Sequence, residues 1–173
     1  MMILTEDKED TDWGDLAGNL RRLVGEDEFS AAEPRLRRCW LAWRPLLREL
    51  RFSVRDCPEP LLALWLEAAA EEAVDLEWKT SPGDSFLLDS LAAELCMSEL
   101  RRRLPGENIA CAPLPTATPG LLAALREAGL ADGAHPDDAA APILTRRYAV
   151  LTYERARGCA ACALRAGCPK LRK

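Results

Sequence analysis

Three cysteines gather near the end of the 173-residue chain, and no other feature constrains its fold as strongly. They are Cys159, Cys162 and Cys168, they follow the pattern C-x2-C-x5-C, and the last is followed by Pro169. A thiolate is a soft, anionic ligand, and two thiolates separated by two residues converge on one ion or on one corner of a cluster. The array therefore predicts a metal site, which needs a fourth ligand from elsewhere in the chain.

The fourth ligand decides which part of the chain the array is joined to. Cys111 and Cys57 each stand at or near the end of a predicted strand, and we expect Cys111 to be the ligand, with Cys57 as the alternative. Cys96 falls inside a predicted helix, and it and Cys39 are the remaining candidates. The sequence thus predicts a staple that ties the Cys-rich segment back to the middle of the chain.

The metal itself has more than one interpretation. A Cys-Pro pair at the last ligand is typical of bacterial ferredoxins, so Cys168-Pro169 favours a 4Fe-4S cluster. Zinc is the alternative, although structural zinc sites usually combine two knuckles and only one is present here. A third interpretation has no metal and assigns thiol redox chemistry to Cys159 and Cys162.

Composition limits the class of protein. Apolar residues make up 49% of the chain and charged residues 29%, which is ordinary for a folded globular protein. No stretch approaches the roughly 20 apolar residues of a membrane span, and the acidic run over residues 6–10 is unlike a signal peptide. We expect a cytoplasmic protein whose seven cysteines, an odd number, do not form a disulfide framework.

Charge is distributed unevenly along the chain. Residues 1–34 hold ten acidic and three basic residues, whereas residues 145–173 hold eight basic residues and one acidic residue. A basic segment of this kind could bind nucleic acid, offset the negative charge of a thiolate site, or dock on an acidic region. Charge alone does not choose among these.

Helical and strand patterns alternate through the middle of the chain. Helices are predicted over 13–24, 34–47, 61–73, 85–104 and 118–125, and strands over 51–56, 74–80, 108–114 and 148–153. The alternation predicts an α/β fold with a small, partly parallel sheet flanked by helices, an N-terminal helical pair and a C-terminal Cys-rich metal staple. The alternative is a mostly α protein, because the strands are short and the helical stretches long.

The same patterns divide the chain into three regions. Residues 1–12 are acidic and predict a mobile tail, residues 13–154 predict the α/β core, and residues 155–173 form the basic Cys-rich metal-binding segment.

The array, with a cysteine far upstream, resembles the Fe–S staple of the PD-(D/E)xK nucleases of CRISPR adaptation and of bacterial recombination helicase–nucleases. It also resembles the auxiliary-cluster domains of radical-SAM enzymes, but the C-x3-C-x2-C triad that holds their catalytic cluster is absent. Glu77-Trp78-Lys79 matches the E-x-K motif of the nucleases. The nuclease resemblance implies Glu77 as a Mg²⁺ ligand, Lys79 as the catalytic base partner and Asp56 as a second acid. A simpler interpretation places Asp75, Glu77 and Lys79 on the solvent face of a half-buried strand.

Three functional hypotheses follow. The first is a small cytoplasmic metal-binding protein with an Fe–S cluster on Cys111, Cys159, Cys162 and Cys168, which acts as an accessory factor for a protein partner and is not an enzyme by itself. The second is a Mg-dependent DNA nuclease, or a degenerate relative, with its site at Glu77, Lys79 and Asp56. The third is a zinc-stapled module that binds protein or nucleic acid.

Overall fold

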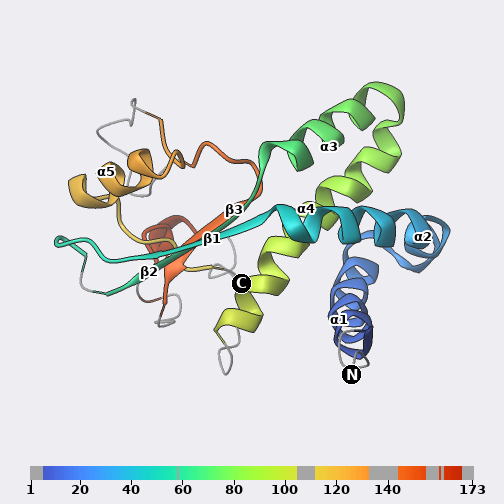
Figure 1. Ribbon diagram of the computed structural model, residues 1–173, viewed down its shortest axis with the longest axis horizontal. Helices are drawn as coiled ribbons and strands as arrows, with labels where there is room; N and C mark the ends of the chain where they lie inside the picture. The colour runs from blue at the N-terminus through green and yellow to red at the C-terminus, as the bar shows by residue number, and fades with distance from the viewer. Residues whose placement is uncertain are drawn as a thin grey trace. The chain divides into compact units, whose positions relative to one another are not determined.

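Five α-helices and three strands make up the regular structure of the described part of the chain (Figure 1). The structure is a computed structural model and describes residues 6–57, 59–104, 112–132, 144–154, 160 and 162–168, with side chains from residue 12 on. In chain order the elements are α1 (Glu6–Val24), α2 (Glu26–Trp43), the 3₁₀ turn η1 (Arg44–Leu46), β1 (Leu47–Phe52), β2 (Leu61–Leu66), α3 (Ala68–Thr80), α4 (Pro82–Arg103), α5 (Pro119–Glu127), β3 (Ala149–Tyr153) and the 3₁₀ turn η3 (Arg165–Gly167). Among the described residues, no helix combines the length and the apolar character that crossing a bilayer requires.

The chain divides into two compact units, and each unit combines two separate stretches of sequence. The helical unit comprises Met1–Leu47 and Leu66–Glu99, and the sheet unit comprises Arg48–Trp65 and Leu100–Lys173. The helical unit holds 19 acidic and 8 basic residues, a formal charge of −11. The sheet unit holds 9 acidic and 15 basic residues, a formal charge of +6. The chain is therefore polarised in charge from one folded unit to the other.

The predicted N-terminal helical pair is present, but both of its starting points differ from the prediction. The first helix, α1, begins at Glu6 rather than at Trp13, so residues 6–12 of the predicted acidic tail are helical. The second helix begins at Glu26 rather than at Pro34, which lies inside α2. Three acidic residues, Glu26, Asp27 and Glu28, occupy the first turn of α2, where negative charge stabilises the helix N-terminus. The helix also continues through Pro34, where the ring removes one hydrogen bond, because residues on both sides of it, such as Phe29 and Leu36, are buried in the core.

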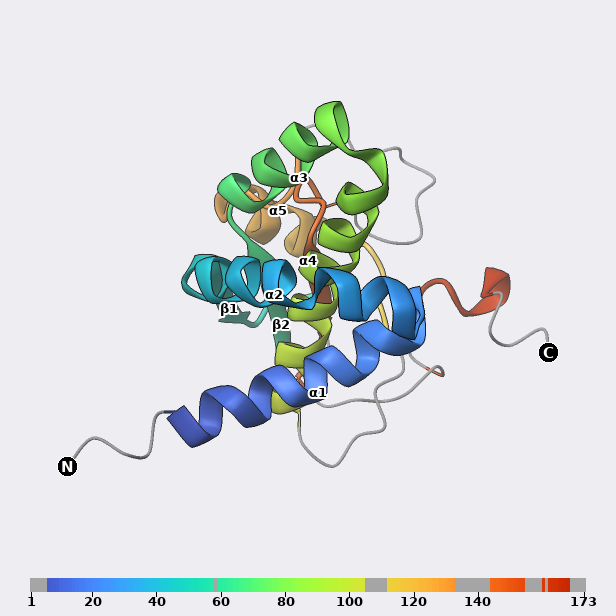
Figure 2. The ribbon, with the colours of Figure 1, turned by 90° about the vertical axis from the view of Figure 1, so that its right-hand side faces the viewer.

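The chain reverses its direction between α1 and α2 (Figure 2), and a glycine lies at the turn. Gly25 has a φ of 94°, which L side chains rarely adopt. Its N–H donates to the carbonyl of Arg21 and its carbonyl accepts from the N–H of Phe29, so it closes one helix and opens the next. Aromatic rings then hold the pair together, because the Trp13 ring lies 6.5 Å from that of Phe29 and 5.4 Å from that of Trp40.

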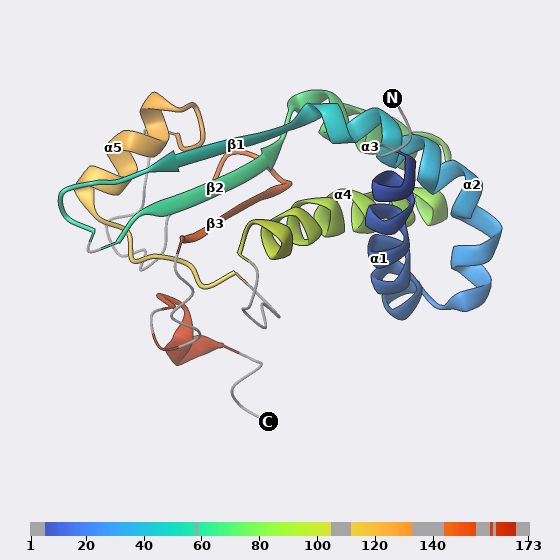
Figure 3. The same ribbon diagram turned by 60° about the horizontal axis from the view of Figure 1, so that its bottom comes forward.

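The sheet is antiparallel, and the partly parallel sheet predicted from the sequence is wrong, although the mixture of helix and sheet is confirmed. Its strand order is β1-β2-β3, with β2 at the centre. β2 and β3 run antiparallel with Leu61 opposite Tyr153 and Trp65 opposite Ala149. Figure 3 shows the three strands side by side, with α5 beside them. The cluster that α5 forms with the sheet consists of Leu61, Ala63, Leu121, Leu125, Leu130, Leu151 and Tyr153.

An exchange of two elements explains the wrong sheet. Residues 61–66, predicted as the start of a helix, form β2, and residues 74–80, predicted as a strand, lie in α3. The first is a short apolar run, which periodicity cannot distinguish from a buried helix. The second alternates in polarity but continues a helix that the strong helix formers from Ala68 onward have begun. The parallel sheet was predicted because a helix at 61–73 followed by a strand at 74–80 would connect neighbouring parallel strands. Since the two elements are exchanged, that connection is absent and the prediction loses its basis.

Most of the remaining predicted helices and strands correspond to observed elements. Predicted helix 85–104 corresponds to α4, helix 118–125 to α5, and strand 148–153 to β3. The predicted strand 51–56 is present but begins earlier, at Leu47. Of the predicted strand 108–114, residues 108–111 lie outside the described residues, and residues 112–114 have no regular secondary structure.

Replacing Gly25 with alanine should destabilise the protein. The positive φ costs an L residue about 1–2 kcal/mol, and a Cβ at this position would lie 2.9 Å from Glu28 Oε2. Gly14→Ala is the matched control, because Gly14 lies in α1 with open space around it and alanine there should add up to about 1 kcal/mol. Urea denaturation measures both, and a Gly25→Ala variant as stable as wild type would contradict the assigned turn.

Candidate metal centre

The part of the cysteine array that the structure describes is a compact turn in the sheet unit. Cys162 and Cys168 are half-buried free thiols on either side of η3. The N–H of Arg165 donates to the carbonyl of Cys162 at 3.0 Å, and the N–H of Cys168 donates to that of Arg165 at 3.3 Å. Two other predicted ligands, Cys159 and Cys111, lie outside the described residues.

A backbone hydrogen bond joins this turn to the segment that follows Cys111. The N–H of Ala163 donates to the carbonyl of Leu114 at 2.9 Å. One residue earlier, the carbonyl of Pro113 accepts from the buried hydroxyl of Thr152 in β3 at 3.1 Å. Residues 113 and 114 therefore bind both β3 and the array, and Cys111 precedes Leu114 by only three residues.

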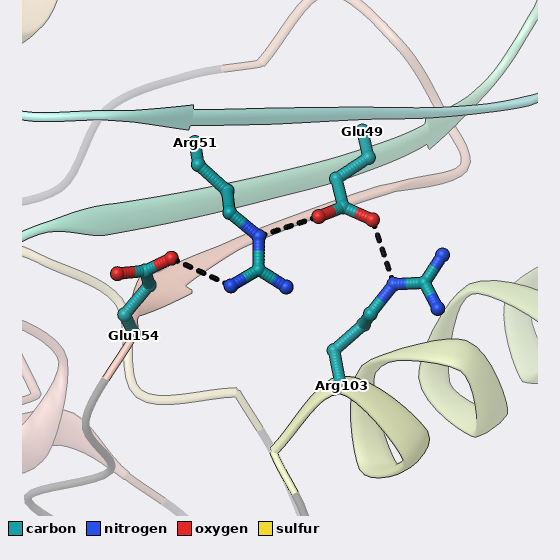
Figure 4. A network of polar contacts seen from close by, with 4 residues as sticks. All are labelled: Glu49, Arg51, Arg103 and Glu154. Carbon is teal, nitrogen blue, oxygen red and sulfur yellow. Dashed lines mark hydrogen bonds and ion pairs between the residues drawn. The ribbon is translucent and has the colours of Figure 1, made fainter.

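A charged network fixes the end of β3, from which the chain continues to the array (Figure 4). Arg51 on β1 donates to Glu49 at 2.6 Å and to Glu154 at 2.9 Å. Arg103, at the end of α4, donates to the other carboxylate oxygen of Glu49 at 2.6 Å. These hydrogen bonds, that from Arg51 first, lower the pKa of Glu49. The Glu154 backbone is held as well, because its N–H donates to the carbonyl of Pro60 at 2.9 Å.

The other described cysteines stand in different surroundings. Cys57 belongs to the sheet unit and is half-buried against the cluster that α5 forms with the sheet. Cys39 and Cys96 belong to the helical unit, and burial raises the pKa of both thiols, that of Cys96 to about 12. Within the described ranges, which omit Cys111 and Cys159, three potential metal-ligating side chains do not come together.

The E-x-K residues do not lie on a strand, and that prediction is wrong. Glu77 and Lys79 lie in α3, and two positions along a helix do not share a face. Glu77 instead binds Arg35 on α2 at 2.5 Å, and Arg35 also binds Asp84 on α4 at 2.9 Å. The alternation of Asp75, Glu77 and Lys79 is therefore part of a helix whose Glu77 is held by an ion pair.

Asp56, the third residue of the proposed nuclease site, caps a helix. Its carboxylate accepts the N–H of Gly120 at the start of α5 at 2.8 Å, and this hydrogen bond lowers the pKa of Asp56. Thr118 caps the same helix through its hydroxyl, which accepts the N–H of Leu121. Asp56 belongs to the sheet unit and Glu77 to the helical unit.

Sequence reasoning missed the two ion-pair systems, one centred on Arg35 and the other on Glu49. Neither had a sequence signal, because the longest separation between partners is 49 residues in the Arg35 system and 103 residues in the Glu49 system. Sequence reasoning also missed that Glu28, Ala31, Ala32 and Arg35 share one face of α2, although residues three and four positions apart are neighbours on a helix.

Comparison of the chain with protein-family models, curated proteins and solved structures gives no match. The features of the described residues that bear on their chemistry are soft thiol donors, a backbone hydrogen bond to the segment after Cys111 and a fixed end of β3.

Replacing Glu49 with glutamine should lower the melting temperature at pH 7. The lowered pKa means that folding favours the carboxylate, so its stabilisation is present above about pH 4.5 and is lost as the pH falls through the lowered pKa. The difference between Glu49→Gln and wild type should therefore shrink below pH 4.5. Glu127→Gln, an equal charge change at an exposed position of α5, is the control. A difference independent of pH, measured by thermal circular dichroism, would contradict the network.

Proposed function

We propose that this chain is a small cytoplasmic metal-binding protein that serves as an accessory factor for a protein partner and is not an enzyme by itself. Its ligands are Cys111, Cys159, Cys162 and Cys168, and its metal group is a 4Fe-4S cluster. When bound, the cluster supplies a cross-link between two chain segments and a one-electron redox centre.

The hydrogen bond from Ala163 to Leu114 is the observation that carries the proposal. Three residues of extended chain span at most about 11 Å, so a segment tied at Leu114 keeps Cys111 within reach of a ligand adjacent to Ala163. The tie supports Cys111 as the fourth ligand over Cys57. It is also independent of the cysteine spacing, because neither Ala163 nor Leu114 is one of the cysteines that define the motif.

The chemistry of the surroundings is compatible with an anionic cluster. The described thiols, Cys162 and Cys168, are half-buried, which limits access of water to their sulfur atoms. The sheet unit carries a formal charge of +6, and Arg165 lies between the two cysteines. Positive charge and backbone N–H groups near thiolate ligands stabilise their negative charge.

Zinc on the same four cysteines is the second candidate, because thiolates also suit a structural zinc site. The Arg-rich sheet unit would then favour a zinc-stapled module that binds nucleic acid or protein. The nuclease alternative has no comparable support, since Glu77 and Lys79 lie on a helix and Asp56 caps another.

Metal analysis of protein purified without oxygen tests the proposal. We expect iron and acid-labile sulfide in equal amounts, together with the broad visible absorption of an Fe–S cluster that is lost on exposure to air. Zinc in place of iron would favour the second candidate, a zinc site on the same four cysteines, over the Fe–S cluster. Protein without either metal would refute the metal site.

Single substitutions identify the ligands. Cys111→Ser, Cys159→Ser, Cys162→Ser and Cys168→Ser should each lose most of the metal, and the matched control Cys39→Ser should keep it. Metal loss should also raise amide hydrogen exchange at Ala163, whose N–H is bound to Leu114. If Cys57→Ser lost the metal and Cys111→Ser kept it, the assignment of the fourth ligand would be wrong.

A further inference from the structure

A groove opens on the helical unit beside α2 and the start of α4. Its volume is about 670 Å³, and its lining includes Glu28, Ala31 and Arg35 on α2 and Gly83 and Phe86 on α4. The groove and all the residues that line it belong to the helical unit. It is comparable in size to pockets that bind small molecules or side chains of a partner.

Small residues create this hollow. Ala31 and Ala32 lie one helical turn from Glu28 and from Arg35, so the four share one face of α2. Gly83 contributes no side chain from α4, and a Cβ built there would meet nothing within 4 Å. Larger side chains at these three positions would occupy the space between the two helices. The groove is thus a consequence of which residues the sequence places on those faces.

An exposed aromatic ring forms one wall of the groove. Phe86 is 54% exposed, although phenylalanine is among the residues most often buried. Leu87 and Val24 add further apolar surface to the same lining. Together these three side chains give the groove an apolar wall that suits the apolar side chains of a partner.

The charge around the groove is negative. Glu28 and Asp84 line it, and the positive charge of Arg35 is matched by Glu77 and Asp84. The helical unit as a whole carries −11. A ligand that fits must therefore present apolar side chains to Phe86 and positive charge to the acidic side chains.

We propose that this groove is the docking site for a segment of a partner protein, an amphipathic helix with leucine-like anchors flanked by lysine or arginine. The inference rests on the accessory role proposed above and gives that role a surface and a partner chemistry, but it does not depend on the metal. A helix that lays its apolar face into a groove is a recurrent mode of peptide recognition.

A second copy of this chain fits the groove less well. Self-association through the groove would bring together two helical units that each carry −11. Like charges at an interface are repulsive, whereas a basic segment gains from the same field. Charge complementarity therefore selects a basic partner.

Fluorescence anisotropy with a designed peptide tests the proposal on the full chain. The probe is a labelled helical peptide of about 15 residues with leucine along one face and lysine elsewhere, and the reference peptide has glutamate in place of lysine. We expect the lysine peptide to bind at least about tenfold more tightly than the glutamate peptide. Equal binding of the two peptides would overturn the charge argument.

Two variants place the binding in the groove. Gly83→Leu should fill the hollow and weaken binding at least about tenfold, while Gly14→Leu, an equal change at an open position of α1, should bind as wild type does. Phe86→Ala should also weaken binding, and because its ring is exposed it should leave the fold intact, as judged by circular dichroism. Binding unchanged in both Gly83→Leu and Phe86→Ala would overturn the proposed site.

Two further outcomes separate the alternatives. Sedimentation could show that the wild type is a dimer and that Gly83→Leu is a monomer. That result would mean that a second copy of the chain, and not a basic partner, occupies the groove. Metal-free Cys162→Ser protein should bind the peptide as wild type does. Metal analysis therefore tests the metal proposal, and peptide binding tests the docking site independently of it.

Discussion

The burial of β2 on both faces is the constraint on which the rest of the sheet unit depends. The four leucines of this strand are completely buried, and each contributes about 2 kcal/mol of hydrophobic stabilisation. A strand that is apolar on both faces needs a neighbour on each edge and a cover on each side. β1 and β3 supply the edges, and α5 supplies part of the cover over Leu61 and Ala63. Because β3 must pair with β2, the segment that continues to the cysteine array starts from a fixed position.

Elements with their own local signals could be predicted from the sequence. α5 has a capping threonine, a proline at its first position and a glycine beyond its end, and β3 is a β-prone run. β2 and α3 were exchanged because their local patterns are ambiguous: β2 lacks polar alternation, since both its faces are buried, and α3 alternates by accident. Only the tertiary structure resolves such an ambiguity, by showing what surrounds each segment.

Sequence alone was enough to propose only part of the candidate site. The spacing of Cys159, Cys162 and Cys168 is a chemical signal that depends on no assignment of secondary structure. The choice of Cys111 needed more, and the backbone hydrogen bond from Ala163 to Leu114, which no cysteine spacing predicts, supports it. The E-x-K match failed because a three-residue motif has meaning only on a strand, and Glu77 is held by Arg35 instead. Long-range ion pairs such as those of Glu49 leave no trace in local sequence.

The pairing of β2 with β3 also has a consequence during synthesis of the chain. Its paired residues are separated by 84 to 92 positions, from Trp65 with Ala149 to Leu61 with Tyr153. A ribosome therefore completes the whole helical unit before it makes the strand that closes one edge of β2. Until then Leu-Leu-Ala-Leu-Trp-Leu is an uncharged, apolar hexapeptide with an open strand edge, and transiently exposed apolar surface of this kind favours aggregation. The interval in which this segment is exposed therefore lasts until residue 149 has been made, and slow translation between residues 66 and 149 should lower the soluble yield.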